Sequence, residues 1–186
     1  MWRLLTLVCV AGSVLAADYS LCFLGAGPKS GTIEKAEAQE LQKKHMGHID
    51  AMWKAGVLES AGPVGRLTGK RGIFLFSVPI HKAQEWAGKD PKVLAGDLSL
   101  ECFLWEGPAG VGTHYREAYG KPGFAEKFGK HTAVLGDVAP QGKTIVQGKL
   151  KNAPWKYFSV VEGAASEGTV FDWYHDPQVW PAKLKD

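Results

Sequence analysis

The sequence predicts an α+β fold that is built on a βαββαβ unit, the ferredoxin-like arrangement. One observation is that short apolar runs alternate with two amphipathic helical segments between residues 18 and 105. Another is that glycine and proline separate these segments, as they do at turns and helix ends. The composition agrees, because 45% hydrophobic and 22% charged side chains over 186 residues are ordinary for a globular chain and exclude a disordered or fibrous one.

The first strand and the first helix have clear limits. Residues 19–24 form an apolar run that stops at Gly25-Ala26-Gly27-Pro28, which predicts a strand and its exit turn. Residues 33–55 have helical periodicity, and Gly56 follows as the stop signal. The stripe on one face of this helix consists of Ile33, Leu41, His45, Ile49 and Met52.

The remaining elements of the unit follow in order. Residues 57–61 predict a second strand before Gly62-Pro63, and residues 72–78 predict a third strand. A short helix is expected at residues 82–88 and a fourth strand at residues 98–105. Strands one, three and four are apolar on both faces, so both faces of the sheet need cover. The two helices can cover only one face of the sheet. The other apolar face is expected to pack against a second sheet, supplied by the rest of this chain or by a second copy in a homodimer.

Residues 107–186 are expected to be a degenerate second unit or a Gly/Pro-rich extension. Several residue pairs match at an offset of 86 positions, and residues 156–161 supply a further strand. Gly136 and Pro140 make the segment after His131 a poor helix, which argues against a full copy. The matches are Lys44-His45 with Lys130-His131, Gly56 with Gly142, Gly62 with Gly148, and Asp90-Pro91 with Asp176-Pro177.

The N-terminus has the pattern of a signal peptide over residues 1–16. Arg3 precedes an apolar centre, and Val14-Leu15-Ala16 fits a cleavage site, so we expect export to the periplasm or outside the cell. The apolar centre is too short to span a bilayer, so no membrane anchor is expected. A net charge of +3 without a basic run excludes a nucleic-acid footprint. Export also allows a disulfide between Cys22 and Cys102, which lie mid-strand on the neighbouring first and fourth strands of this fold.

Several short motifs occur in a characteristic order within residues 18–106. They are His45-Met46-Gly47-His48-Ile49, Gly56-Val57-Leu58, Ala61-Gly62-Pro63, Gly72-Ile73-Phe74-Leu75-Phe76 and Ala87-Gly88-Lys89-Asp90-Pro91. In this order and spacing the chain resembles the YCII-related family, which builds dimeric α/β barrels from ferredoxin-like units. The resemblance implies the same barrel type here. The sequence departs from the family pattern at Lys92, because family members usually have an aromatic residue after the Asp-Pro pair.

His45 is the first candidate catalytic residue, because it is a titratable group on the otherwise apolar stripe of a helix. The resemblance implies Asp90 as its partner, since the family is suspected of using a His–Asp pair. We therefore expect a small acid–base enzyme, of the lactone isomerase or lyase type, that acts on a small-molecule ligand. The alternative is a non-catalytic binding module in which His45 is structural.

No metal or cofactor is expected. His45 and His48 lie three residues apart and could approach one ion, but no third ligand lies nearby in the sequence. The Gly25-Ala26-Gly27 turn lacks the third glycine of a nucleotide-binding loop. Trp53, Trp86 and Trp105 could line an apolar pocket or could belong to the core.

Overall fold

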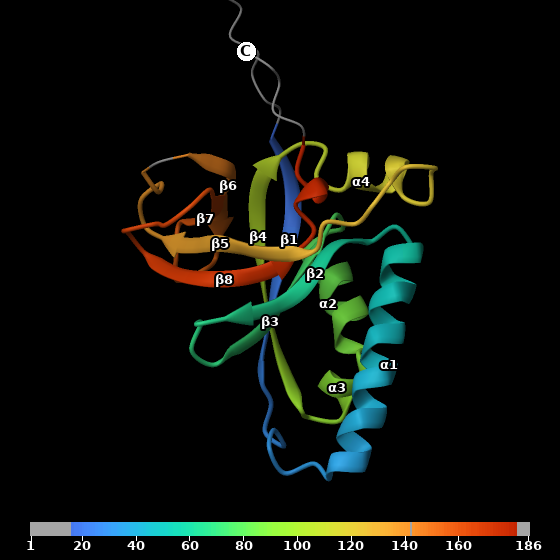
Figure 1. Ribbon diagram of the computed structural model, residues 1–186. Helices are drawn as coiled ribbons and strands as arrows, with labels where there is room; N and C mark the ends of the chain where they lie inside the picture. The colour runs from blue at the N-terminus through green and yellow to red at the C-terminus, as the bar shows by residue number, and fades with distance from the viewer. Residues whose placement is uncertain (1–15, 142, 182–186) are drawn as a thin grey trace, which may run out of the picture.

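The computed structural model describes residues 16–141 and 143–181, in which eight antiparallel strands form one closed barrel (Figure 1). The order around the barrel is β1-β3-β2-β8-β5-β7-β6-β4. The strands are β1 (Ala16–Ala26), β2 (Leu58–Gly65), β3 (Lys70–Phe76), β4 (Leu98–Pro108), β5 (Gly129–Gly136), β6 (Thr144–Lys151), β7 (Tyr157–Val161) and β8 (Thr169–His175). The helices are α1 (Lys35–Lys54), α2 (Ile80–Gly88), α3 (Pro91–Leu94), α4 (Thr113–Ala118) and the 3-10 turn η1 (Pro177–Val179).

The predicted fold class is wrong. The structure is a closed eight-stranded antiparallel barrel formed by one chain, not a ferredoxin-like α+β unit of the dimeric α/β barrel type. The error has its origin in residues 107–186, whose described part contains four strands and no helix longer than the six residues of α4. These strands pair with the edges β2 and β4, so no open edge remains for a second copy.

The barrel interior is the larger of two apolar cores. Inward side chains from both halves of the chain meet there, so the second sheet that the sequence predicts comes from the same chain. This leaves the expected homodimer through the sheet face without support. The interior includes Leu21, Phe23, Ile73, Leu75, Trp105, Ala133, Leu135, Phe158, Phe171 and Trp173, all of them fully buried.

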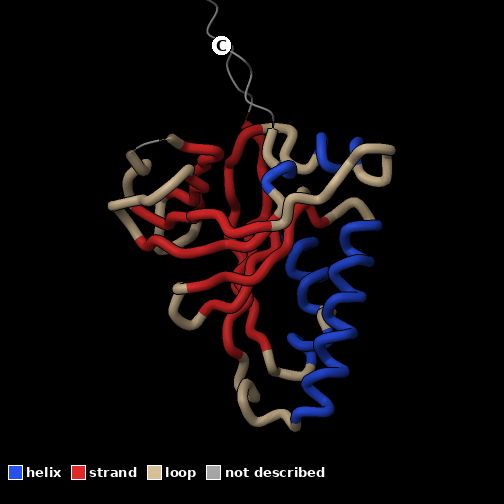
Figure 2. The backbone as a smooth tube through the Cα atoms, viewed as in Figure 1, coloured by secondary structure: helices blue, strands red, loops and turns tan. Residues whose placement is uncertain are grey.

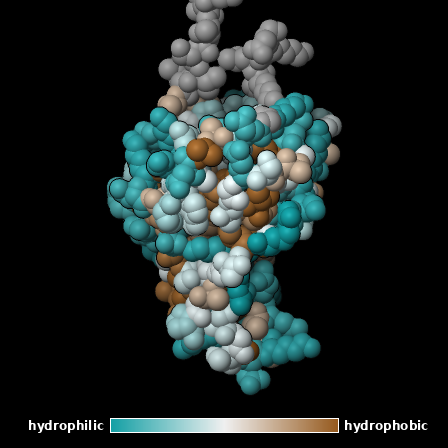
Figure 3. All heavy atoms as spheres, turned by 90° about the vertical axis from the view of Figure 1, so that its left-hand side faces the viewer, coloured by the Kyte–Doolittle hydropathy of each residue, from teal (hydrophilic) through white to brown (hydrophobic). Residues whose placement is uncertain are grey.

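The second core lies between the strands of the first half and the helices. Figure 2 shows that α1, α2 and α3 all lie on one side of the barrel. Met52 of α1 and Ala83 and Ala87 of α2 pack there against Phe74 and Phe76 of β3. The side that faces away from these helices shows apolar residues between a larger number of polar ones (Figure 3). The interface between α1, α2 and α3 and the strands therefore lies on one side of the barrel.

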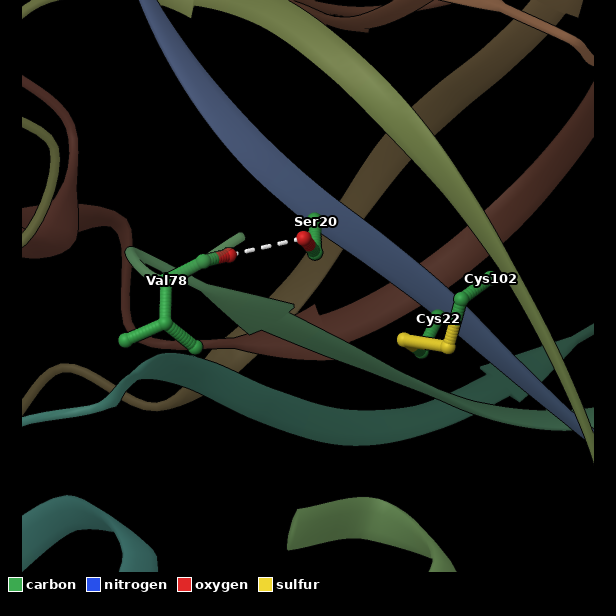
Figure 4. Close-up of a disulfide and its surroundings, with 4 residues drawn as sticks. All are labelled: Ser20, Cys22, Val78 and Cys102. Atoms are coloured by element: carbon green, nitrogen blue, oxygen red, sulfur yellow. Dashed lines mark hydrogen bonds between the residues drawn. A yellow bond between two sulfur atoms is a disulfide. The ribbon is translucent and has the colours of Figure 1, made fainter. Parts of the chain in front are cut away.

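The predicted disulfide is confirmed. Cys22 of β1 and Cys102 of β4 are direct partners in the strand register, with a Cα–Cα distance of 4.0 Å, and their sulfurs are bonded (Figure 4). The predicted signal peptide lies outside the described residues except for Ala16, which begins β1. Among the helices in the described part of the chain, none has the length and apolarity needed to cross a bilayer.

Candidate active site

His45 and Asp90 come together at the boundary between α1 and the α2–α3 connection. His45 is on the inner face of α1 and is 9% exposed, and Asp90 is fully buried. The distance between His45 Nδ1 and Asp90 Oδ2 is 2.6 Å. The structure therefore brings together the two residues that the sequence analysis selected, which lie 45 positions apart.

Local chemistry fixes the orientation of Asp90. It is the N-cap of α3, and its Oδ1 accepts a hydrogen bond of 2.9 Å from the backbone N–H of Lys92. Pro91 at the first helical position holds the turn. One carboxylate oxygen therefore stabilises the helix start while the other is free to contact His45.

The carboxylate selects one tautomer of the His45 ring. An ionised carboxylate only accepts hydrogen bonds, so Nδ1 is the donor and Nε2 carries the lone pair. The ring also stacks on Phe74 of β3, with a centroid distance of 6.0 Å and an interplanar angle of 24°. Its rotation is therefore restricted, and the free nitrogen is held in one direction.

His45 lines a cavity of about 340 Å³ between α1 and strands β2 and β3, which we call the His45 cavity. Its walls are mostly apolar, and Leu24, Ile49 and Phe74 are among them. Its charged lining side chains are Arg71 and Lys92, and no carboxylate lines it in the described part of the chain.

The two cations of the His45 cavity differ in their surroundings. Lys92 Nζ lies 3.0 Å from the carboxylate of Asp97, so its charge is compensated. Arg71 donates to the hydroxyl of Ser30 and has no carboxylate within ion-pair distance among the described residues. Arg71 therefore supplies a positive charge at the cavity that is not paired with a carboxylate and that favours an anionic ligand.

A second cavity of about 380 Å³ continues the groove along α1, and we call it the aromatic chamber. Trp53, Tyr115, Tyr119 and Phe128 are among its lining residues. The two cavities share the lining residues Met46, Ile49, Ala61 and Phe128, so they are neighbouring compartments of one groove.

A metal ion near these cavities would need a group of ligating side chains around it. Within the described residues there is no group of three or more His, Cys, Asp or Glu side chains that could hold a metal ion. His48 does not converge with His45, because its Nε2 lies 2.9 Å from the backbone carbonyl oxygen of Trp86, to which it donates.

Comparisons of the chain with protein-family models, with curated proteins and with solved structures returned no match. The resemblance to the YCII-related family therefore stays a prediction.

Sequence reasoning missed most of the aromatic chamber. The sequence offers Trp53 as a residue of a pocket or of the core, but nothing in it links Trp53 to Tyr115, Tyr119 and Phe128, which follow the first four strands. One signal was available, since Tyr115 and Tyr119 are four residues apart and lie on the same side of a helical turn. What they face depends on the path of the chain between β4 and β5, which has no periodicity to reveal it.

Proposed function

We propose that this protein is an acid–base enzyme in which His45 and Asp90 move a proton on a small organic acid bound in the His45 cavity. The observation that carries the proposal is the 2.6 Å contact between Nδ1 of His45, which lines that cavity, and the fully buried carboxylate of Asp90 behind it. A histidine held in this way is a typical general base, because the carboxylate orients the ring and stabilises the imidazolium that forms.

The substrate class follows from the other lining residues. A carboxylate of the substrate would meet Arg71 and Lys92, while its carbon skeleton would contact the apolar wall. His45 Nε2 would then accept a proton from a carbon next to a carbonyl or carboxyl group. The electron pair of that C–H bond moves into an enolate, whose charge the two cations stabilise.

The fate of the proton decides the reaction type. In an isomerase the imidazolium returns the proton to a different carbon of the same molecule. In a lyase the enolate expels a leaving group from the neighbouring carbon, and the proton leaves His45 with it or to water. Both reactions need only the two side chains, and a lactone or conjugated acid is a suitable substrate for either.

The test is proton exchange on ligands found by a screen. Small carboxylic acids and lactones are screened by thermal shift, and the C–H signals of each hit are followed by NMR in D₂O with the protein present. His45→Gln should bind the same hits and slow exchange about 10²–10⁴-fold, the usual contribution of a general base. Gln can still donate to Asp90, so the cost in folding free energy should be at most about 1–2 kcal/mol.

His48→Gln is the matched control, because His48 is on the same helix but does not line either cavity. It should exchange ligand protons at the wild-type rate. If hits bind but wild type and His45→Gln exchange their protons equally, the protein is a non-catalytic binding module.

We also propose that the chain is exported. The support is the N-terminal sequence pattern together with the Cys22–Cys102 disulfide, since structural disulfides persist in oxidising compartments.

A further inference from the structure

The aromatic chamber is lined by four aromatic side chains together with aliphatic ones, and three of the aromatic rings contact one another. The Trp53 and Tyr119 rings have centroids 4.5 Å apart at an interplanar angle of 62°, and Trp53 and Tyr115 meet at 88°. Tyr115 also packs edge-on against Phe124. Aromatic rings attract cations through their π faces, and the Arg116 guanidinium already lies 5.5 Å from the centroid of the Trp53 ring.

The mouth of the groove is apolar and exposed. Met46, Tyr119 and Phe128 are 53%, 47% and 61% exposed, and all three line the groove. Large apolar side chains that gather at the rim of a cavity are typical of a ligand-binding site.

The charge of the aromatic chamber is the opposite of that of the His45 cavity. Its charged lining residues in the described part of the chain are Asp50, Glu59, Glu126 and Asp176, with no Lys, Arg or His. Two of these carboxylates already have cationic partners, because Asp50 pairs with Lys54 and Glu59 pairs with Arg116.

Glu126 and Asp176 have no cationic partner among the described residues. Glu126 accepts from the hydroxyl of Tyr115 at 2.5 Å. Asp176 is 7% exposed and accepts from the backbone N–H groups of Lys127 and Gln178. These neutral donors satisfy hydrogen bonds but leave two negative charges at the chamber wall.

The pKa of the Tyr115 hydroxyl is affected by burial and by these two negative charges. Burial raises its pKa, and so do the hydrogen bond to Glu126 and the charges of Glu126 and Asp176. Negative potential therefore coincides with aromatic surface in one cavity of about 380 Å³, a volume suited to a small organic molecule.

We propose that the aromatic chamber binds an organic ammonium group, held by the Trp53, Tyr115 and Tyr119 rings and by the charges of Glu126 and Asp176. A metal ion fits less well, because the described residues do not bring three ligating side chains together. The inference does not depend on the proposed activity of His45, since none of the five residues named lines the His45 cavity.

The ammonium group can belong to a separate amine or to the far end of the acid in the His45 cavity. The chamber and the His45 cavity share lining residues and have opposite charge, so one zwitterionic molecule could occupy both. The chemistry recognised in the chamber is the same in both cases.

The experiment is a titration of the full chain with tetramethylammonium chloride at constant ionic strength, followed by tryptophan fluorescence and calorimetry. Saturable binding is expected in wild type. Glu126→Gln and Tyr119→Leu should each weaken it about 5–30-fold, the range of a partly desolvated cation–π or charge contact. Tyr119 is 47% exposed, so its replacement should leave the fold intact.

Glu117→Gln is the charge-matched control, because Glu117 is exposed on α4 and does not line the chamber. It should bind like wild type, and so should His45→Gln, which separates this inference from the proposed activity. The inference is overturned if wild type gives no saturable signal beyond that of sodium chloride, or if Glu126→Gln and Tyr119→Leu bind as tightly as Glu117→Gln.

A second arm identifies the source of the ammonium group. Trimethylammonio-carboxylates of increasing chain length are titrated against wild type and Arg71→Ala. If a trimethylammonio-carboxylate binds wild type more tightly than tetramethylammonium does, and Arg71→Ala abolishes this gain, one ligand occupies both cavities. Equal binding shows a separate amine, and either result supports the ammonium site.

Discussion

His175 lies wholly inside the barrel, where its ring is surrounded by other rings. The centroids of Trp173 and His131 are 4.3 and 4.5 Å from that of His175. The pKa of His175 is lowered to about 3, mainly by burial and in smaller part by the nearby His131, while Asp176 opposes the shift. The folded chain therefore keeps this ring neutral well below the pH at which an unfolded chain protonates it.

Because the pKa of His175 is lower in the folded chain than in the unfolded chain, the protein becomes less stable as the pH falls. Above about pH 6.5 both states are neutral at His175, and its contribution to stability is fully present. As the pH falls toward 3, the unfolded state binds a proton that the folded state excludes, so the free energy of unfolding decreases by up to about 1.4 kcal/mol for each pH unit. Urea unfolding of His175→Phe between pH 7 and 4.5 should show a smaller decrease than wild type. His81 is exposed, so His81→Phe is the control, and its free energy of unfolding should decrease with pH as that of wild type does. If the free energy of unfolding of His175→Phe decreases as steeply as that of wild type, the assignment to His175 is contradicted.

At the residue scale, the disulfide contact could be predicted because Cys22 and Cys102 lie mid-strand on neighbouring strands. The stripe on residues 33–55 places His45 toward the sheet, the family resemblance implies Asp90 as its partner, and the structure brings the two together. The roles of these two residues stay predictions. The position of Asp176 could not be predicted, because it depends on the turn after β8 that directs η1 back toward α1.

At the scale of elements, two glycines of the first half differ in the space around them. Gly47 is exposed in the middle of α1, and a Cβ added there would meet nothing within 4 Å. Gly62 is in β2, and a Cβ there would overlap with the backbone carbonyl oxygen of Tyr174 in β8. The first glycine only costs helix stability, while the second allows two strands to approach.

We expect Gly47→Ala to stabilise the protein by about 0.5–1 kcal/mol, because Ala restricts the unfolded chain and favours the helix. Gly62→Ala should destabilise it by about 1–3 kcal/mol or more, since the backbone of β8 must move away. The free energy of unfolding from urea titrations measures both. Equal effects of the two substitutions would show that the close approach of β2 and β8 is not needed.

The elements of the first half could be predicted better than those of the second. Strands and helices are found near all six ranges expected between residues 18 and 105, because each has its own periodicity and its own Gly or Pro boundary. In the second half only residues 156–161 were expected as a strand, and β7 confirms this. The match of His45 with His131 misled the comparison of the halves, since His45 is in a helix and His131 is in β5.

At the scale of the whole molecule, the strand order repeats. The first half runs β4-β1-β3-β2 and the second runs β8-β5-β7-β6, so the two halves meet at β2–β8 and at β6–β4. Gly62 and Gly148, which match at the offset of 86, lie at these two junctions. A Cβ at Gly148 would overlap with the Glu106 carbonyl and the Trp105 indole of β4. Sequence periodicity could not predict the closure, because it describes which face of a strand is buried and not which strand lies at its edge.

The closed barrel predicts that residues 17–108 cannot form a stable monomer without the rest of the chain. In that fragment the inward faces of β1, β3 and β4 would lose their cover, and Leu21, Phe23, Ile73, Leu75 and Trp105, all fully buried in the barrel, would be exposed to water. Exposing each such side chain costs about 1.5–3 kcal/mol, which in sum is comparable to the whole stability of a small domain. In light scattering coupled to size-exclusion chromatography, residues 17–186 should elute as a monomer and the fragment as a dimer or larger aggregate. The fragment with Leu21→Ser and Leu75→Ser is the control, and it should associate less because association depends on the inward face. A monomeric fragment that unfolds cooperatively would instead show that residues 17–108 are an autonomous domain and that the second half only packs against it.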